Sequence, residues 1–368
     1  MLSVNSVRFL DYRKLYTAYQ DEIDSAIKRS LITGKLILQD DVEEFERRFA
    51  EFLGVKHVVG LNSGTDALMM ALIAAGVGPG DEVITVSHTF IATIQVIHHV
   101  GATPVLVDVG EDGLMDVNKV REAITEKTQA VIPVHLSGDV VGTNELLYEL
   151  NKYDRRDHGI IMVEDAAQAI GAKGVGYGLS QCYSFYPAKV LGTFGDAGAL
   201  ATNDGDTAAR VKSLRNHGGV TKYDQETYEY GWNSRLDNIW AACLNVKLDY
   251  LRIDLKKREE VANRYNDAFA DTEMILPVNR PGRIWQDYVV RFESMQRRDE
   301  MKKHLDSKGV ETLGAGQLPN HRHPGLGLDH FNLPKTDEHV FCSLRLPCNH
   351  FLEPEEVSYV IESVKSGL

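Results

Sequence analysis

A lone lysine, Lys189, stands in the uncharged and turn-rich stretch SFYPAKVLGTFGDAGAL, residues 184–200. The next acidic residue along the chain is Asp196. In an uncharged pocket the ammonium form is disfavoured, so the pKa falls and the amine becomes a nucleophile suited to Schiff-base chemistry with an aldehyde. The alternative is a surface lysine in a glycine-rich loop, because most lysines are exposed.

The segment NSGTDAL, residues 62–68, joins an expected strand to an expected helix. Ser63, Gly64 and Thr65 would then lie at a helix N-terminus, where unpaired amides and the helix dipole favour an anion. Ser184 could add a hydroxyl group to such a phosphate site. A plain N-cap formed by Ser63 or Thr65 is the alternative.

The segment VEDAAQAIGA, residues 163–172, places Asp165 at the carboxyl end of a very apolar stretch, with Gln168 three residues later. A carboxylate in that position requires a cationic or hydrogen-bonding partner, for example a protonated ring nitrogen. An N-cap aspartate is the alternative interpretation.

Two polar residues, Asn233 and Arg235, lie in GWNSRLDN, residues 231–238, just before a long expected helix. They are candidates for ligand contact. The alternative is an ordinary helix start at which Asn233 or Ser234 acts as the cap.

The first three segments together predict a cofactor site. A phosphate cradle, a carboxylate for a ring nitrogen and an amine nucleophile are what pyridoxal phosphate requires from a protein. They occur in that order along the chain, and Asp165 and Lys189 are only 24 residues apart. We therefore expect these segments to meet in one site.

The elements that must bring them together are visible as apolar runs. Strands are expected at 57–61, 81–86, 103–109, 129–136 and 158–165, and helices at 41–54 and 65–75. Apolar strands separated by helices predict a parallel sheet covered on both faces. Ligands bind at the carboxyl ends of such strands.

A different pattern begins near residue 236. A helix is expected over 236–270, then a strand over 285–293, a helix over 297–309 and a last helix from Glu355. This pattern predicts a large cofactor-binding domain at 1–250 and a smaller C-terminal α/β domain at 251–368. The long loop 313–332, rich in glycine and histidine, is expected to be functional or disordered.

Composition limits the classes of partner. The chain has 368 residues, 43% of them hydrophobic, and a net charge of −13. That charge disfavours nucleic acid as a partner. Four cysteines without CxxC spacing predict free thiols and no metal site. The sequence shows neither a signal peptide nor an apolar run long enough to cross a membrane, so we expect a cytoplasmic protein.

The whole set of motifs resembles the DegT/StrS-type sugar aminotransferases, a branch of the fold-type I pyridoxal-phosphate enzymes. The similarity runs from about residue 30 to the C-terminus and includes NSGTDAL, SHTFIAT, VEDAAQAIGA, SFYPAKVLGTFGDAGAL, LRNHG and GWNSRLDN. The resemblance implies an α/β fold with a mainly parallel seven-stranded sheet flanked by helices, plus a smaller C-terminal α/β domain.

The resemblance also implies roles for residues around the cofactor ring. Lys189 carries pyridoxal 5'-phosphate as a Schiff base, and Asp165 pairs with its pyridinium nitrogen. Gln168 contacts the ring oxygen, and Phe90 of SHTFIAT stacks on the ring face.

For the cofactor phosphate, the resemblance implies contacts from Gly64, Thr65 and Ser184. It further implies that Asn233 reaches the phosphate of the neighbouring subunit's cofactor. The expected assembly is therefore a homodimer with shared active sites.

Lysine at position 189 favours transamination, because a divergent branch of the family has histidine there and performs a deoxygenation. The expected reaction moves an amino group from glutamate or glutamine to a keto-sugar, in amino-sugar, cell-surface glycan (lipopolysaccharide O-antigen) or antibiotic biosynthesis. The favoured acceptor is a nucleotide-linked 3- or 4-keto-6-deoxy sugar. The alternatives are a keto-cyclitol or keto-octulosonate acceptor, a pyridoxal-phosphate lyase, and a regulatory protein without turnover.

On the substrate side, His321 and His323 lie where relatives often place a histidine that meets the sugar or its phosphates, and Arg235 is a further candidate. Two histidines without a third ligand do not predict a metal site. Where many relatives carry HLYG, this chain has HLSG at 135–138, followed by Asp139.

Overall fold

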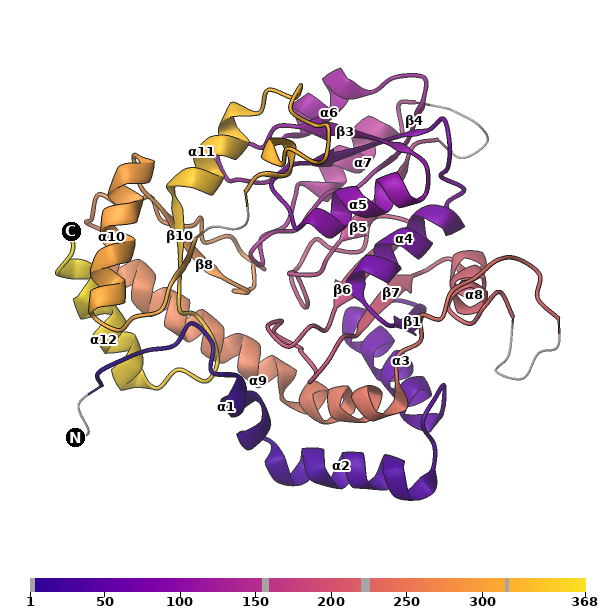
Figure 1. Ribbon diagram of the computed structural model, residues 1–368, viewed down its shortest axis with the longest axis horizontal. Helices are drawn as coiled ribbons and strands as arrows, with labels where there is room; N and C mark the ends of the chain where they lie inside the picture. Colours follow the sequence, from indigo (N-terminus) through magenta and orange to yellow (C-terminus); the bar gives the residue numbers. More distant parts are fainter. Residues whose placement is uncertain (1–3, 154–158, 220–225, 315–317) are drawn as a thin grey trace.

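The computed structural model describes residues 4–153, 159–219, 226–314 and 318–368. Figure 1 shows a large sheet flanked by helices and a smaller C-terminal sheet, with the long helix α9 running from one to the other. The strands are β1 (His57–Leu61), β2 (Glu82–Val86), β3 (Thr103–Val107), β4 (Thr128–Val131), β5 (Ile161–Asp165), β6 (Ser180–Ser184), β7 (Gly198–Thr202), β8 (Tyr288–Arg291), β9 (Leu313–Gly314) and β10 (Ser343–Leu346).

The helices cover both sheets and connect most of the strands. They are α1 (Tyr12–Thr17), α2 (Gln20–Thr33), α3 (Asp40–Leu53), α4 (Gly64–Ala74), α5 (Ile91–His99), α6 (Val117–Ala123), α7 (Thr143–Leu150), α8 (Gly205–Leu214), α9 (Asn238–Phe269), α10 (Met295–Ser307), α11 (Pro334–Cys342) and α12 (Pro354–Lys365), with a short 3-10 helix η1 (Asn320–Arg322).

The large sheet has seven strands in the order β1-β7-β6-β5-β4-β2-β3. The five strands from β6 to β3 in that order are parallel, whereas β7 is antiparallel to both β1 and β6. The predicted mainly parallel seven-stranded sheet is therefore confirmed. Its parallel strands end at one edge, which is the edge where the chemistry-bearing residues gather.

Several of the predicted strands are shorter than expected, among them those at 103–109 and 285–293, which end at Val107 and Arg291. The strand expected over 129–136 ends at Val131, since Pro133 has no amide to donate and only an isolated bridge between Val134 and Asp165 follows. The strand expected over 158–165 begins at Ile161, and residue 158 lies outside the described residues.

Strands β6 and β7 lie on either side of the lysine loop, and their sequences do not predict strands. SQCYS (β6) is largely polar and GALAT (β7) consists mostly of small residues, yet they pair, with Ser184 opposite Gly198. The connection 185–197 between them carries Lys189. The lysine is therefore held on a loop with both ends fixed in the sheet.

One core layer lies between α3, the sheet and α9. Phe49 is 0% exposed, and its ring centroid lies 5.3 Å from that of Tyr183 and 5.4 Å from that of Phe185. Helix α3 ends at Gly54, whose φ of 72° lies in the left-handed region that glycine adopts most readily. The side chains of this layer pack against β6 and against the start of the loop that carries Lys189.

The C-terminal sheet has the order β8-β10-β9 and packs against α10, α12 and the second half of α9. Val7 joins this unit rather than the large sheet: its amide donates to the Gly309 carbonyl at 2.9 Å, and its carbonyl accepts from Glu311. The domain boundary predicted at residue 250 falls inside α9, and the division into two domains stays a prediction.

The loop expected at 313–332 contains β9 and η1, while residues 315–317 lie outside the described residues. Within the described ranges, no helix has the length and apolarity needed to cross a membrane. All four cysteines are buried and unpaired.

Replacing Phe49→Ala should lower the free energy of unfolding by about 3–5 kcal/mol, because it leaves a cavity beside Tyr183 and Phe185. Urea denaturation followed by circular dichroism measures the loss. The matched control is Tyr148→Ala on α7, where the ring is 66% exposed and the change should stay within about 0.5 kcal/mol. Equal losses in both variants would contradict the proposed core layer.

Candidate active site

Lys189 is half-buried in the loop that follows β6. Its amine makes no hydrogen bond or ion pair with any other described residue. Burial of the ammonium end lowers the pKa of Lys189 below its usual 10.5, and Arg345 lowers it further, whereas Asp165 and Asp287 raise it. The site therefore favours a reactive, neutral amine within reach of two carboxylates.

Asp165 ends β5 and is buried. Its Oδ2 accepts a hydrogen bond from Thr93 Oγ1 at 2.8 Å, and its Oδ1 accepts one from the Ala167 amide at 3.2 Å. A carboxylate can accept about four hydrogen bonds. These two contacts thus fix the carboxylate and leave capacity for one more donor, such as a protonated ring nitrogen.

Thr93 is a site residue that sequence reasoning did not assign. It lies on the first turn of α5, and its hydroxyl is also 2.8 Å from the hydroxyl of Thr89. Both threonines belong to the SHTFIAT block that contains Phe90. The sequence therefore identifies the SHTFIAT block, but nothing in it indicates that Thr93 contacts Asp165, which lies 72 positions further along the chain.

The turn before α4 forms a cradle of small residues. The Ser63 hydroxyl caps the helix by accepting from the Asp66 amide at 3.1 Å, and the amides of Gly64 and Thr65 have no partner among the described residues. A β-carbon on Gly64 would lie 2.9 Å from that of Ser184. The turn that carries the free amides of Gly64 and Thr65 therefore lies next to Ser184, as a phosphate site requires.

The same cradle is closed by β7. A β-carbon on Gly198 would lie 2.2 Å from the Ser63 carbonyl carbon, a distance that real side chains do not tolerate. Glycine at this position lets the β1–α4 turn lie directly against the first residue of β7. Gly198, one of the glycines that follow Lys189, thus allows the cradle to pack against β7.

Among the described residues of one chain, neither Asn233 nor Arg235 makes a hydrogen bond with Lys189 or Asp165, and both contact Asn216 instead. Asn233 is exposed and forms an isolated bridge with Asn216, and the Arg235 guanidinium donates to the Asn216 side-chain oxygen at 3.2 Å. Between them, Ser234 donates to Asp66 Oδ2 at 2.6 Å, which ties this segment to α4. The predicted contact of Asn233 with a neighbouring subunit stays a prediction.

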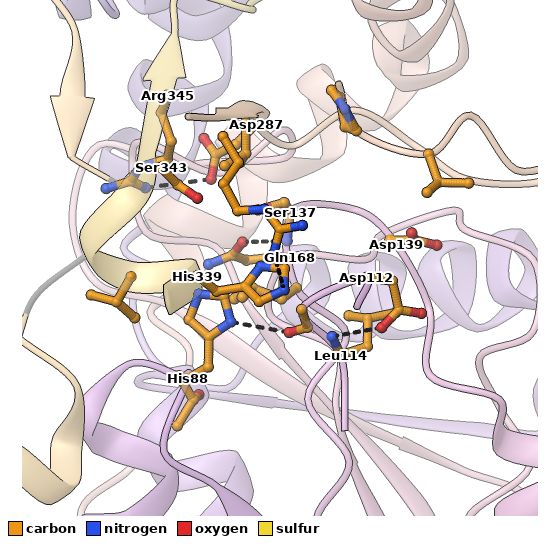
Figure 2. Close-up of a pocket in the computed structure, with 18 of the residues that line it drawn as sticks. His88, Asp112, Leu114, Ser137, Asp139, Gln168, Asp287, His339, Ser343 and Arg345 are labelled. Carbon is orange, nitrogen blue, oxygen red and sulfur yellow. Dashed lines mark hydrogen bonds and ion pairs between the residues drawn. The ribbon is translucent and has the colours of Figure 1, made fainter. Parts of the chain in front are cut away.

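A cavity of about 280 Å³ lies between loops of the large sheet and the C-terminal unit. Figure 2 shows Gln168 beside Ser137, whose amide donates to Gln168 Oε1 at 2.8 Å, and Asp287 beside Arg345, with their charged atoms 3.4 Å apart. Phe90 also lines the cavity and is 57% exposed. Gln168 and Phe90 therefore both line the cavity, where they could contact a flat ring.

The segment from Ser137 to Asp139 joins the two units. Ser137 and Gly138 have φ of 55° and 86°, and a β-carbon on Gly138 would lie 2.0 Å from the Ile284 carbonyl oxygen. Asp139 pairs with Arg280 at 3.0 Å and with Arg283 at 3.3 Å. The segment thus anchors the C-terminal unit and places a small serine, rather than a large side chain, at the cavity wall.

The two histidines of the HRH segment lie outside the described lining of the cavity. His321 is buried, with Nδ1 2.8 Å from the Ser87 hydroxyl and Nε2 3.3 Å from Asp337, and burial lowers its pKa. His323 is half-buried. Their contact with a substrate stays a prediction. Among the described residues no cluster of three or more metal-binding side chains is found.

The described residues fit pyridoxal phosphate. A partnerless buried amine, a fixed carboxylate with spare acceptor capacity and a cradle of free amides lie at one end of the sheet. When bound, pyridoxal phosphate supplies an aldehyde carbon and an electron-accepting ring. Lys189 would hold the aldehyde, Asp165 the ring nitrogen, and Gly64, Thr65 and Ser184 the phosphate.

Comparison with known proteins agrees with this geometry. The chain belongs to the DegT/DnrJ/EryC1/StrS aminotransferase family, whose sequence description matches residues 17–365. It is a pyridoxal-phosphate-dependent sugar aminotransferase. The dTDP-3-amino-3,4,6-trideoxy-alpha-D-glucose transaminase of Streptomyces venezuelae is 41% identical over 371 residues, which cover 98% of this chain and 95% of that protein.

Two solved structures show the same fold. The crystal structure of DesV from S. venezuelae, in complex with a ketimine intermediate, matches with a TM-score of 0.92 at 39% identity, covering 99% of this chain and 98% of that one. NtdA from Bacillus subtilis with bound cofactor PMP matches with a TM-score of 0.94 at 28% identity, covering 99% and 86%. The predicted family, fold class and cofactor are therefore confirmed.

Charges around Lys189 should set the pH at which the cofactor-free protein captures pyridoxal phosphate, since only the neutral amine reacts. Asp287 raises the pKa of Lys189, so Asp287→Asn should move the midpoint of capture to lower pH. Arg345→Met removes a charge that lowers this pKa and should move the midpoint to higher pH. The measurement is the initial rate of borohydride-trapped Lys189 at each pH; unchanged midpoints in both variants would refute the electrostatic account.

Proposed function

We propose that this enzyme transfers the amino group of glutamate to the C3 position of a nucleotide-linked 3-keto-6-deoxy sugar in the cytoplasm. The observation that carries the proposal is an unpartnered Lys189 amine that feels the charge of the fixed Asp165 carboxylate, next to a sugar-sized cavity. The name of the S. venezuelae relative, which specifies a dTDP-linked 3-amino sugar, supports the choice of carbon and of the nucleotide.

The cavity supports a ligand rich in hydroxyl groups. Its lining carries both acids and bases, including Asp112, Asp139, Arg283 and Arg291. Side chains of both signs can donate to and accept from hydroxyl groups at the same time. Asp112 and Asp139 already pair with Arg280, and Arg291 pairs with Glu338, so hydroxyl groups of a ligand would add hydrogen bonds to existing ion pairs.

In the reaction, Lys189 has two tasks. Its amine would hold the aldehyde carbon of the cofactor, and when free the same amine would take a proton from the substrate carbon and return one. Burial lowers the pKa of Lys189 below its usual 10.5, which favours the neutral amine that can accept a proton. Asp165, held by Thr93 and Ala167, would accept a hydrogen bond from the ring nitrogen of the cofactor.

We infer that the active unit is a homodimer in which Asn233 enters the partner's site. Asn233 is exposed in the single chain, and the aromatic residues around it are also exposed: Tyr228 by 69%, Tyr230 by 98% and Trp232 by 38%. A row of uncovered aromatic side chains is typical of a protein interface. A second copy that covers these rings would bring Asn233 toward a neighbouring phosphate cradle.

With glutamate as donor, the enzyme should turn over a nucleotide-linked 3-keto-6-deoxyhexose at least about tenfold faster than the 4-keto isomer. Lys189→Ala should lower kcat at least about a thousandfold with an unchanged circular dichroism spectrum. The matched control is the exposed Lys56→Ala, which should keep wild-type activity. Turnover of the 4-keto isomer or of a free keto-cyclitol alone would refute the proposed acceptor.

Mixing two inactive variants tests the shared site. Lys189→Ala and Asn233→Ala subunits, each with little activity alone, should regain about a quarter of wild-type activity after joint refolding, because each mixed dimer contains one intact site. Mixing Lys189→Ala with a Lys189→Ala, Asn233→Ala double variant provides the control, since no intact site can form. If the first mixture stays as inactive as the control, the two residues act within one subunit.

A further inference from the structure

A residue of the C-terminal unit forms hydrogen bonds with the loop that carries Lys189. Gln286 lies two positions before β8 and is buried. Its side-chain Oε1 accepts from the Val190 amide at 3.2 Å, and its Nε2 donates to the Ala188 carbonyl at 3.1 Å. One side-chain amide therefore bonds to the backbone on both sides of Lys189.

These two bonds require a side chain with one donor and one acceptor at adjacent atoms. A side-chain amide offers both, whereas a carboxylate offers acceptors only and an ammonium donors only. The Val190 amide is buried, so its loss of a partner would be costly. The contact thus fixes both peptide units from which the Lys189 side chain departs.

Gln286 itself is held rigidly in the C-terminal unit. The buried guanidinium of Arg258, on α9, donates through Nη1 to the Gln286 carbonyl at 3.1 Å. The same nitrogen donates to the Trp285 carbonyl at 3.1 Å and to the Cys348 carbonyl at 2.8 Å. The backbone that presents the Gln286 amide is therefore fixed to α9 and to the segment after β10.

The far end of the loop is fixed by a second buried contact. The ammonium of Lys247, on α9, donates to the Gly192 carbonyl, and burial lowers the pKa of Lys247 to about 8. A β-carbon on Gly192 would lie 2.7 Å from the carbonyl oxygens of Tyr186 and Pro187, so the loop folds closely on itself. Gln286 thus acts on a loop that has little other freedom, at the two residues next to Lys189.

We propose that Gln286 is a positioning residue that aims the amine of Lys189, so that the C-terminal unit sets the geometry of the reacting amine. The proposal rests on the assignment of Lys189 as the cofactor-bearing lysine. Gln286 lies outside the described lining of the cavity, so it acts through the backbone rather than on the substrate. Its removal should therefore slow the steps that Lys189 performs and leave substrate affinity nearly unchanged.

The test compares Gln286→Met, which keeps the volume but removes both hydrogen bonds, with Gln286→His, whose neutral ring keeps one donor and one acceptor. In the cofactor-free protein, Gln286→Met should slow borohydride-trapped capture of pyridoxal phosphate at Lys189 by about tenfold, and Gln286→His should retain part of the rate. In the loaded enzyme, kcat should fall by about tenfold in Gln286→Met while KM changes by less than about twofold.

The matched control is Gln181→Met on β6. Gln181 is also buried, and its Nε2 donates to a backbone carbonyl, that of Gly178, at 3.2 Å. This variant should lose stability without slowing capture. If Gln286→Met captures the cofactor at the wild-type rate, or loses rate only in proportion to its loss of melting temperature as Gln181→Met does, the proposal is wrong. Failure of the wild type to be trapped at Lys189 would instead refute the assignment of the lysine.

Discussion

Lys189 keeps its amine inside the protein without a hydrogen-bond partner among the described residues, and this arrangement opposes the charged form of the group. Burial is the largest influence on the pKa of Lys189 and lowers it. The nearby charges modify this effect, since Asp165 and Asp287 raise the pKa and Arg345 lowers it. Because both sheets contribute one or more of these groups, the chemistry depends on how the two units are held together.

The topology of the large sheet explains why the cofactor groups converge. The parallel strand β5 ends at Asp165, the cradle follows β1, and the lysine loop leaves β6, so three connections meet at one edge. The antiparallel β7 brings the loop back into the sheet beside the cradle, and Gly198 allows the close approach. The sheet thus fixes the ring and phosphate contacts, whereas the C-terminal unit fixes the amine.

Sequence reasoning located the residues whose local setting is unusual. Lys189, Asp165 and the NSGTDAL turn were found because each combines a special residue with a recognisable strand end or helix start. Thr93, Ser234 and Gln286 were not found, since each acts through a contact with a residue 72 to 168 positions away. Strands β6 and β7 were also missed as a pair, because polar and small residues form strands only when neighbouring strands and helices bury them.

The pairing of Val7 with Val310 has a consequence for synthesis on the ribosome. Val7 belongs to the C-terminal unit, so its partner Val310 is made only after the seven-stranded sheet. The segment around Val7 can dock only after some three hundred further residues have been made. In nascent chains this segment should therefore stay accessible to protease until Val310 has emerged from the ribosome.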